Sequence, residues 1–335
     1  ASTSAPTGFT PTYTYSGLVS GDTSATLSNS AATYDSTHAG QATKVTVSGL
    51  SITGVTGSNG SLPSDYVLNS TSKDVSAAIT AATLTPTVSN TGVTKVYDAG
   101  TSAPTGFTPT YTYSGLVSGD TSATLSNAGT AYNDANVSQA NKVTVSGLNI
   151  TGVTGNNGSL PSDYVLSATS KDVAATITPK TVTLSATKVY DGTTTLTNAQ
   201  VTIGTGINGE SLTTSAATAS DAHVVTSSNK SIASITLADG TGGLASNYQL
   251  PALNSTNAPV TINAATLTPT VSNTGVTKVY DAGTSAPSGF TPTYTYSGLV
   301  DGDSSAALSN SGAAYNNANV LQANQVTVSG LSITG

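Results

Sequence analysis

Residues 102–127 read SAPTGFTPTYTYSGLVSGDTSATLSN, and the same run already stands at residues 4–29. A near copy, SAPSGFTPTYTYSGLVDGDSSAALSN, begins at Ser285. Inside this run threonine and tyrosine alternate from Thr110 to Tyr113, which is the two-residue period of a half-buried β-strand. A domain-sized segment with strand-like patterning is therefore repeated along the chain, and this repetition decides which folds can form.

A second signal, Lys-Val-Tyr-Asp, gives the spacing of the repeats. It begins at Lys95, Lys188 and Lys278, which are 93 and 90 residues apart. We expect the first segment to lack its opening strands and the last to lack its closing strands, as in a window taken from a longer array. Together the two signals divide the chain into segments 1–80, 81–178, 179–263 and 264–335.

The aromatic residues keep fixed places in the repeat. All three Phe share one repeat position, and the fifteen Tyr fall on five others. Each large ring buries some 150–250 Å², so fixed aromatic positions predict a core rebuilt in every copy. The third segment has no Phe and no Tyr-x-Tyr. It keeps Lys-Val-Tyr-Asp-Gly, the pair Tyr248 and Leu250, and the pair Val260 and Ile262, so we expect these residues to define the fold.

Turn and strand signals in the complete second segment predict six or seven short strands. Pro86 cannot donate a ladder hydrogen bond and indicates an edge strand or a strand start. Lys95–Asp98 is expected to be a short strand that enters an Asp-Ala-Gly turn, with Gly100 at positive φ. In Lys142–Thr151 the apolar alternation changes phase at Gly147, which predicts a bulge or bend.

The chain is therefore expected to be all-β. The strand count favours a tandem array of small immunoglobulin-like β-sandwich repeats that form an elongated rod. A β-solenoid is the alternative, since it suits a composition rich in Ser, Thr, Asn and Gly. Its coils would repeat every 20–30 residues, and no such period is present. The joins between segments are short, which favours a stiff array.

Composition limits the possible partners. Only 7% of the residues are charged and the formal net charge is −7, with nine Lys and no Arg. This balance removes the electrostatic basis for binding nucleic acid or an anionic membrane surface. No run of 18 apolar residues occurs, so no membrane insertion is expected. The chain contains no Cys and is compatible with an oxidising compartment.

Three features together resemble a known family. They are Lys-Val-Tyr-Asp-Gly near the start of a segment, Asp163-Tyr164 or Asn247-Tyr248 near its end, and a closing strand that leads into Thr-Pro-Lys or Ala-Ala-Thr-Leu-Thr-Pro. This pattern is similar to the YDG and MBG (mostly β, glycine-rich) repeats of large bacterial adhesins and filamentous-haemagglutinin-like exoproteins. The resemblance implies a stalk exported to the bacterial cell surface. It implies no active-site residue.

No catalytic, cofactor-binding or metal-binding residue is predicted. His38 and His223 are not equivalent in the repeat, and neither has a partner recognisable by motif, so both are expected in surface loops. Asp22, Asp120 and Asp301 follow or precede glycine and could offer carboxylates to calcium. Calcium needs six to eight oxygen ligands, and the joins hold almost no acid, so these residues are interpreted as turn formers.

The ligand-binding candidates are Tyr111 and Tyr113, which could stack against a sugar. The favoured interpretation is that their face is core or packs on a neighbouring segment. Three functions stay open: stalk or spacer of a secreted bacterial surface adhesin, subunit of a self-assembling extracellular fibre, sheath or matrix filament, and carbohydrate-binding module. The corresponding partners are neighbouring repeats of the same chain, other copies of the chain, and glycans. Catalysis is not expected.

Overall fold

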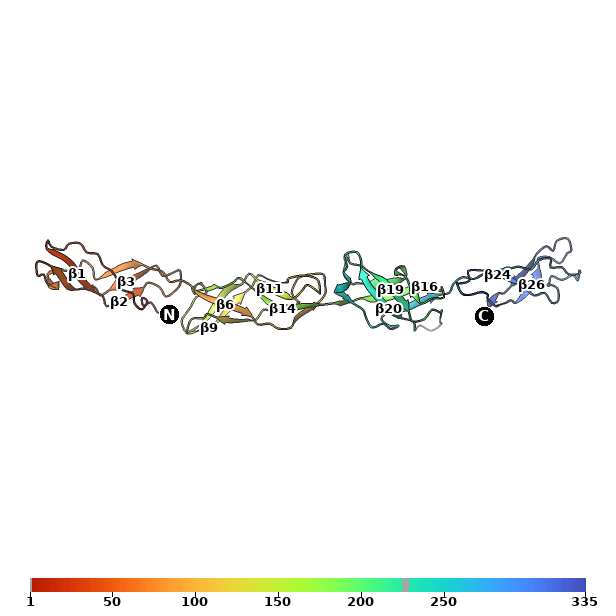
Figure 1. Cartoon of the computed structure of the whole chain (residues 1–335), viewed down its shortest axis with the longest axis horizontal. Helices are drawn as coiled ribbons and strands as arrows, with labels where there is room; N and C mark the ends of the chain where they lie inside the picture. The colour runs from red at the N-terminus through yellow and green to blue at the C-terminus, as the bar shows by residue number, and fades with distance from the viewer. Residues whose placement is uncertain (1, 225–228) are drawn as a thin grey trace. The chain divides into compact units, whose positions relative to one another are not determined.

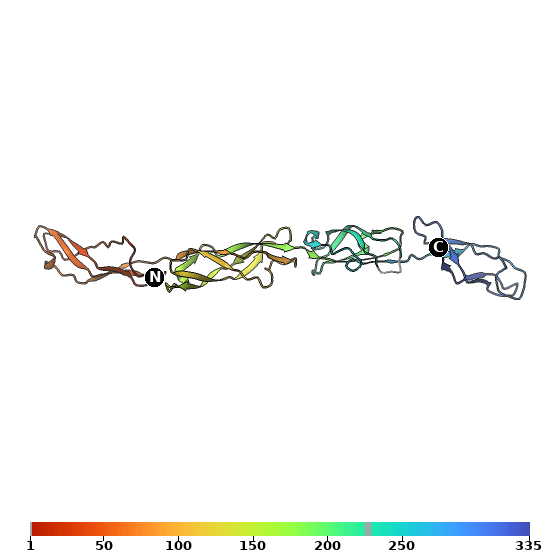
Figure 2. The ribbon, with the colours of Figure 1, turned by 90° about the horizontal axis from the view of Figure 1, so that it is seen from below.

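The computed structural model describes residues 2–224 and 229–335, and within these ranges the chain is all-β with four short 3-10 turns and no α-helix (Figures 1 and 2). The four segments are called repeats 1 to 4 below. The chain divides into two compact units, Ala1–Thr178 and Pro179–Gly335. Repeats 1 and 2 make up the first unit, and repeats 3 and 4 the second.

Repeat 2 is built from three small sheets that do not close into a barrel. Their strand orders are β10-β11-β14-β7, β13-β6-β8 and β12-β9. The strands are β6 (Ala82–Val88), β7 (Val93–Val96), β8 (Tyr111–Ser114), β9 (Asp120–Ser126), β10 (Gly129–Tyr132), β11 (Lys142–Ser146), β12 (Asn149–Gly155), β13 (Tyr164–Leu166) and β14 (Ser170–Thr178), with the 3-10 turn η2 (Pro161–Asp163).

The predicted bend at Gly147 is confirmed. Gly147 has φ +64° and separates β11 from β12, so that Val145 before it and Leu148 after it are both buried. A Cβ on Gly147 would lie 2.5 Å from the Cβ of Ala128. Glycine is required here both for the left-handed backbone and for the close approach of the neighbouring loop.

The first and last strands of repeat 2 run parallel to each other. Ala82 pairs with Tyr164 at the start of the strands, and Val93 pairs with Ala175 further along. In both stretches the partners are 82 positions apart in the sequence. The opening segment 82–96 and the closing segment 164–178 therefore pair in two separate stretches, and the register is the same in both.

The core of repeat 2 lies between these paired strands and the antiparallel strands that cover them. Leu84, Ala123, Ile150 and Tyr164 form one buried cluster. Pro86 is also buried, and at this position β6 pairs on one side only, with β8. A one-sided position suits proline because it has no backbone N–H to donate to a second neighbouring strand.

Repeat 3 keeps the same parallel pairing without the Phe and Tyr-x-Tyr residues. Lys180 pairs with Tyr248, and Lys188 pairs with Ile262. The sequence features that repeat 3 retains are thus the ones that form its opening and closing strands. Its elements are β15 (Lys180–Thr181), β16 (Thr183–Val189), β17 (Thr195–Leu196), β18 (Val201–Gly204), β19 (Leu212–Ala219), β20 (Ile232–Asp239), β21 (Tyr248–Gln249) and β22 (Val260–Asn263), with η3 (Asn198–Gln200) and η4 (Ala245–Asn247).

Repeats 1 and 4 each contain part of this arrangement. Repeat 1 has β1 (Asp22–Ser28), β2 (Ala31–Tyr34), β3 (Lys44–Ser48), β4 (Ser51–Gly57), η1 (Pro63–Asp65) and β5 (Ser72–Ser76). Repeat 4 has β23 (Thr268–Val271), β24 (Tyr294–Ser297), β25 (Leu308–Ser309), β26 (Gly312–Tyr315), β27 (Val326–Ser329) and β28 (Ser332–Ile333).

The expectation of an equal core in every copy is wrong for repeat 4. Tyr97 and Tyr248 are buried, but Tyr280, the counterpart of Tyr97, is 59% exposed. The physical reason is that residues 264–335 contain no counterpart of β14, the strand that packs beside the Tyr97 segment in repeat 2. Every strand pairing in the described ranges joins strands of one repeat, so these pairings do not build the continuous coil of a solenoid.

Candidate functional site

The lysine that recurs in Lys-Val-Tyr-Asp has a largely buried side chain and holds the turn that follows it. The side chain of Lys188 is fully buried, and its Nζ lies 2.7 Å from Asp191 Oδ1. The same ammonium donates to the carbonyl oxygens of Thr193 at 3.0 Å and Thr195 at 2.8 Å. Three donors thus meet three acceptors, and this satisfies the ammonium that burial has removed from water.

The equivalent lysines of repeats 2 and 4 make the same contacts. Lys95 Nζ donates to Asp98 Oδ1 at 2.6 Å and to the carbonyl oxygen of Gly100 at 2.7 Å. Lys278 Nζ donates to Asp281 Oδ1 at 2.8 Å. Lys95 also lies 5.4 Å from the centre of the Tyr132 ring, a cation–π distance. The lysine is therefore a brace within the repeat.

The aspartate closes the turn from the other side. Asp98 Oδ1 accepts the backbone N–H of Gly100 at 2.9 Å, and Asp191 Oδ1 accepts that of Thr193 at 3.0 Å, as in an Asx turn. The Lys188 ammonium, with these local hydrogen bonds, holds the pKa of Asp191 below its usual value. The carboxylate is thus kept in the charged form that the turn needs.

The position of positive φ in this turn differs from the expectation. Gly100 does not adopt it; the preceding residue, Ala99, has φ +62°, and Ala282 in repeat 4 has φ +63°. In repeat 3 the position belongs to Gly192, with φ +75°. In all three of these turns the lysine ammonium also binds the aspartate and the carbonyl oxygen two residues after it, and the residue between lies in the left-handed region. Alanine is strained there and glycine is not.

A tyrosine–carboxylate pair forms a second recurring contact. The Tyr164 hydroxyl donates to Asp120 Oδ2 at 2.5 Å and accepts the backbone N–H of Val117 at 2.9 Å. Repeat 1 has the same pair in Tyr66 and Asp22. Burial, together with the hydrogen bond to Asp120, raises the pKa of Tyr164. Asp22 and Asp120 therefore serve as acceptors inside the repeat.

The divergent repeat 3 preserves this contact with different residues. Tyr248 donates to Glu210 Oε2 at 2.5 Å, so the single Glu of the chain takes the part played by Asp elsewhere. The sequence carried a signal for this pair. Both Gly-Asp and Asn-Gly-Glu precede a strand, and a Tyr follows 38 to 44 residues later. Within the described ranges no three His, Cys, Asp or Glu side chains gather as a metal site would require.

The two tyrosines considered for sugar binding lie on β8, opposite β6. Tyr113 pairs with Pro86 and packs against the cluster of Leu84, Ala123, Ile150 and Tyr164. Tyr111 pairs with Val88. Both rings are half-buried, and burial raises the pKa of both hydroxyls. The structure brings the two residues together on one strand, with part of each ring facing the interior.

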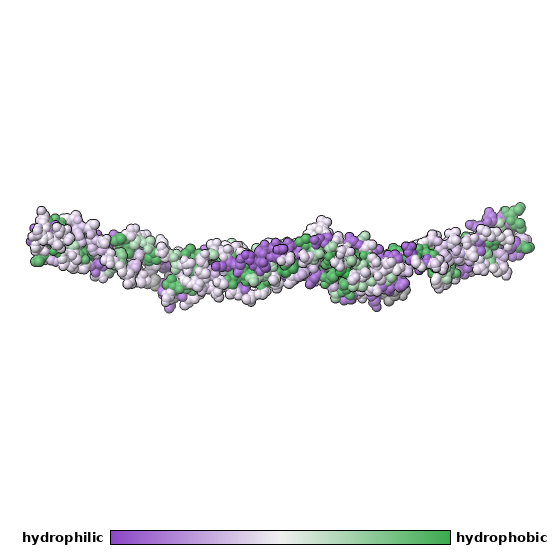
Figure 3. Space-filling model, viewed as in Figure 1, coloured by the Kyte–Doolittle hydropathy of each residue, from purple (hydrophilic) through white to green (hydrophobic). Residues whose placement is uncertain are grey.

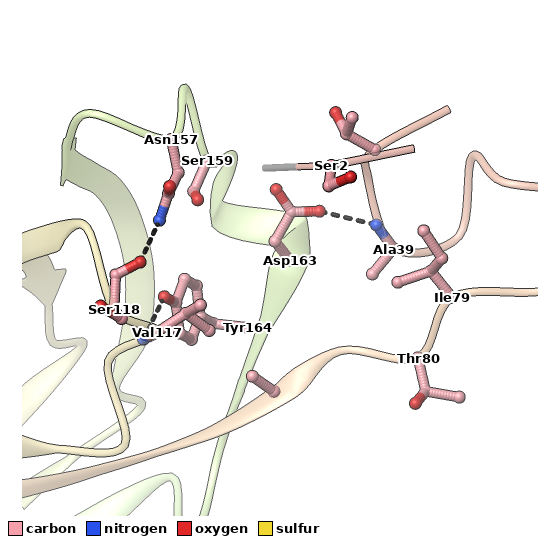
Figure 4. A pocket seen from close by; sticks show the side chains of 12 residues that line it. Ser2, Ala39, Ile79, Thr80, Val117, Ser118, Asn157, Ser159, Asp163 and Tyr164 are labelled. Carbon is pink, nitrogen blue, oxygen red and sulfur yellow. Dashed lines mark hydrogen bonds between the residues drawn. The ribbon is translucent and has the colours of Figure 1, made fainter. Parts of the chain in front are cut away.

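A cleft of about 530 Å³ separates repeats 1 and 2, and Asp163 spans one side of it (Figure 4). Asp163 Oδ1 accepts the backbone N–H of Ala39 at 2.7 Å, and Oδ2 lies 2.8 Å from His38 Nδ1. Oδ2 also accepts the N–H of Leu160 at 2.8 Å. Burial acts to raise the pKa of Asp163, but the hydrogen bonds from His38, Leu160 and Ala39 outweigh it and lower the pKa.

The partner of His38 is thus 125 positions away in the sequence, which no motif could indicate. His38 links the 35–42 loop of repeat 1 to η2 of repeat 2. The other histidine, His223, stacks on Tyr190 within repeat 3, with ring centres 6.0 Å apart. The join lines another part of the cleft through Ile79 and Thr80, and repeat 2 lines more of it, with Tyr164 among its residues (Figure 4).

These observations define a class: a tandem-repeat β-protein in which repeats 2, 3 and 4 each contain a lysine-braced Lys-Val-Tyr-Asp turn. The chain belongs to the YDG domain family, whose sequence model matches residues 80–171, 173–258 and 263–335. Comparison with curated proteins and with solved structures finds no match. In the described part of the chain, no helix is long and apolar enough to cross a membrane.

Proposed function

We propose that the chain is a spacer: YDG repeats that hold a binding region away from the surface of a bacterial cell, as part of a secreted adhesin. The observation that carries this proposal is the parallel pairing of the first and last strands of a repeat. Parallel neighbours begin at the same end, so the chain enters repeat 2 at Ala82 and leaves it at Thr178, at the opposite end. At about 3.3 Å per residue, the opening segment 82–96 spans roughly 50 Å.

Repeats with opposite termini add length when they are joined, whereas repeats with adjacent termini fold back on each other. The join supports this interpretation, because Asp163 fixes repeat 1 to repeat 2 through His38 and Ala39. We infer that the repeats are small immunoglobulin-like sandwiches arranged as a rod. Export to the extracellular face of a bacterium is part of the proposal and is supported by the family and by a chain without Cys.

The surface also suits a passive role. Figure 3 shows a face that is mostly white and pale purple, with one stretch of deep purple and several separate green patches. Some Ser and Thr hydroxyls of neighbouring strands pair with each other, as in Ser28 with Ser51 and Ser89 with Thr110. A surface of this kind supports a spacer better than a recognition module, because recognition sites concentrate aromatic residues and Arg.

The test is small-angle scattering combined with light scattering on the full chain. A compact globule of 335 residues would have a radius of gyration of about 20 Å. The spacer predicts a particle of monomer mass, 32.9 kDa, with a radius of gyration well above that figure. A mass that grows with concentration would favour the fibre, and a monomer near 20 Å would refute the spacer. Glycan-array binding that is lost in Tyr111→Ala would favour the carbohydrate-binding module.

A further inference from the structure

The geometry of the opening and closing segments has a mechanical consequence. Tension on a chain pulls the N-terminal end of segment 82–96 one way and the C-terminal end of segment 164–178 the other way. Because the two segments are parallel neighbours, the pull lies along their ladder and the segments must slide past each other. Antiparallel neighbours joined by a hairpin would instead peel apart from one end.

We propose that each complete YDG repeat is a shear clamp that resists tension between its two ends. This inference rests on the proposed spacer function and adds to it a reason for the fold. Sliding must break the three paired positions of β6 with β13 and the four of β7 with β14 together. Peeling would break them one after another, at a lower force.

Side chains reinforce the ladder at the C-terminal patch of repeat 2. Thr178 Oγ1 donates to the carbonyl oxygen of Lys95 at 3.2 Å, and the hydroxyls of Thr94 and Thr176 lie 3.4 Å apart. Tyr97 N–H donates to the Thr178 carbonyl oxygen at 2.9 Å. These links lie beside the Lys95 brace, which fixes the turn that follows β7.

Repeat 3 has the same clamp in spite of its divergent sequence. Ala186 N–H donates to the Pro259 carbonyl oxygen at 2.9 Å, and Tyr190 N–H donates to that of Asn263 at 2.8 Å. Repeat 3 has lost the Phe and the Tyr-x-Tyr residues, yet it has kept the Lys, Tyr and Ile positions of this ladder. A mechanical role explains why the opening and closing strands are the part retained.

The absence of Cys from the chain allows the direction of force to be chosen by placing two cysteines as attachment points. Thr80→Cys with Pro179→Cys loads repeat 2 through its two opposite ends and shears the ladder. Thr101→Cys with Pro179→Cys grips the chain just beyond the C-terminal ends of β7 and β14, so that tension peels the same ladder. Both variants carry Pro179→Cys in the full chain, and hydrogen exchange of β14 shows whether repeat 2 is folded in each.

Single-molecule force spectroscopy then compares the two geometries at one pulling speed. The clamp predicts a higher rupture force for the 80/179 attachment than for the 101/179 attachment. Equal forces, or a higher force for the 101/179 pair, would overturn it. Such a result would leave the spacer proposal standing, because that proposal is judged separately by the scattering of the unmodified chain.

Discussion

Ala99 offers the sharpest test of how the Lys-Val-Tyr-Asp turn is built. It lies at φ +62° between Asp98 and Gly100, which are joined by an Asx hydrogen bond of 2.9 Å and are both bound by the Lys95 ammonium. An L-residue in this region is strained by about 1–2 kcal/mol. Ala99→Gly removes that strain, but it also gives the unfolded chain more freedom, which costs about 0.4–1 kcal/mol. The net expectation is a stabilisation of about 0.5–1 kcal/mol.

The assay is native-state hydrogen exchange followed by mass spectrometry on the peptide that contains β7 and the turn. Because each 1.4 kcal/mol is tenfold, exchange in Ala99→Gly should slow by about two- to fivefold. Ala282→Gly in repeat 4 should slow exchange at its own turn by a similar factor, since Ala282 has φ +63°.

The reverse change is the control. Gly192→Ala introduces the strain into repeat 3, and its Cβ would meet Val300 Cγ1 at 3.3 Å. It should speed exchange of the β16 and β22 amides by about tenfold, in line with a cost of about 1–2 kcal/mol. Faster exchange in Ala99→Gly, or unchanged exchange in Gly192→Ala, would show that the turn is not strained at this position.

Three further changes test the contacts described above. Lys188→Met removes the buried ammonium and leaves the Thr193 and Thr195 carbonyl oxygens without their donor. The local stability of repeat 3, measured by hydrogen exchange, should therefore fall by about 2–3 kcal/mol. An unchanged exchange rate would contradict the role of Lys188 as a brace. Asp163→Ala removes the acceptor of the Ala39 amide and should speed its hydrogen exchange by about tenfold or more. Lowering the pH until Asp163 is protonated should weaken the same contact in the parent chain. The sign follows from the lowered pKa of Asp163: its contribution is complete above the unfolded pKa near 3.8 and is lost as the pH falls through the folded value. Tyr164→Phe should cost about 1–3 kcal/mol by stranding Asp120. The raised pKa of Tyr164 means that the parent chain keeps this contribution below pH 10 and loses it as the pH rises through the folded value. The parent-minus-variant difference in tyrosinate absorbance should therefore appear above pH 10, and a difference that appears at the ordinary tyrosine pKa would contradict this.

Local features of the fold were predictable from the sequence, because they depend on near neighbours. The phase change around Gly147 predicted a bend, since a two-residue period cannot shift without one. The all-β class followed from alternation and from residues that favour strands. Positive φ was assigned to Gly100 because glycine adopts it most easily, but in the turn closed by Asp98 and Lys95 it is Ala99 that adopts it.

Contacts between distant residues were not predictable. Alternation indicates that Val173 and Ile177 lie on one face of a strand, but it does not say that the neighbouring strand is β7 or that it runs parallel. The bonds of His38 to Asp163 and of Tyr248 to Glu210 join loops that only the folded chain brings together. Burial of Lys188 was hidden as well, because its acceptors are mostly backbone carbonyl oxygens, which every sequence possesses.

The spacer and the shear clamp both depend on the parallel ladder between β7 and β14, and an engineered disulfide tests that ladder directly. Thr94 and Thr176 are register partners with hydroxyl oxygens 3.4 Å apart, so Thr94→Cys with Thr176→Cys should place two thiols in bonding range in a chain that has no other Cys. We expect near-complete, intramolecular oxidation, seen as a mass loss of two hydrogens, while the shifted pair Thr94→Cys with Ser170→Cys stays reduced. Equal oxidation of both pairs, or none in the first, would contradict the parallel pairing of β7 with β14.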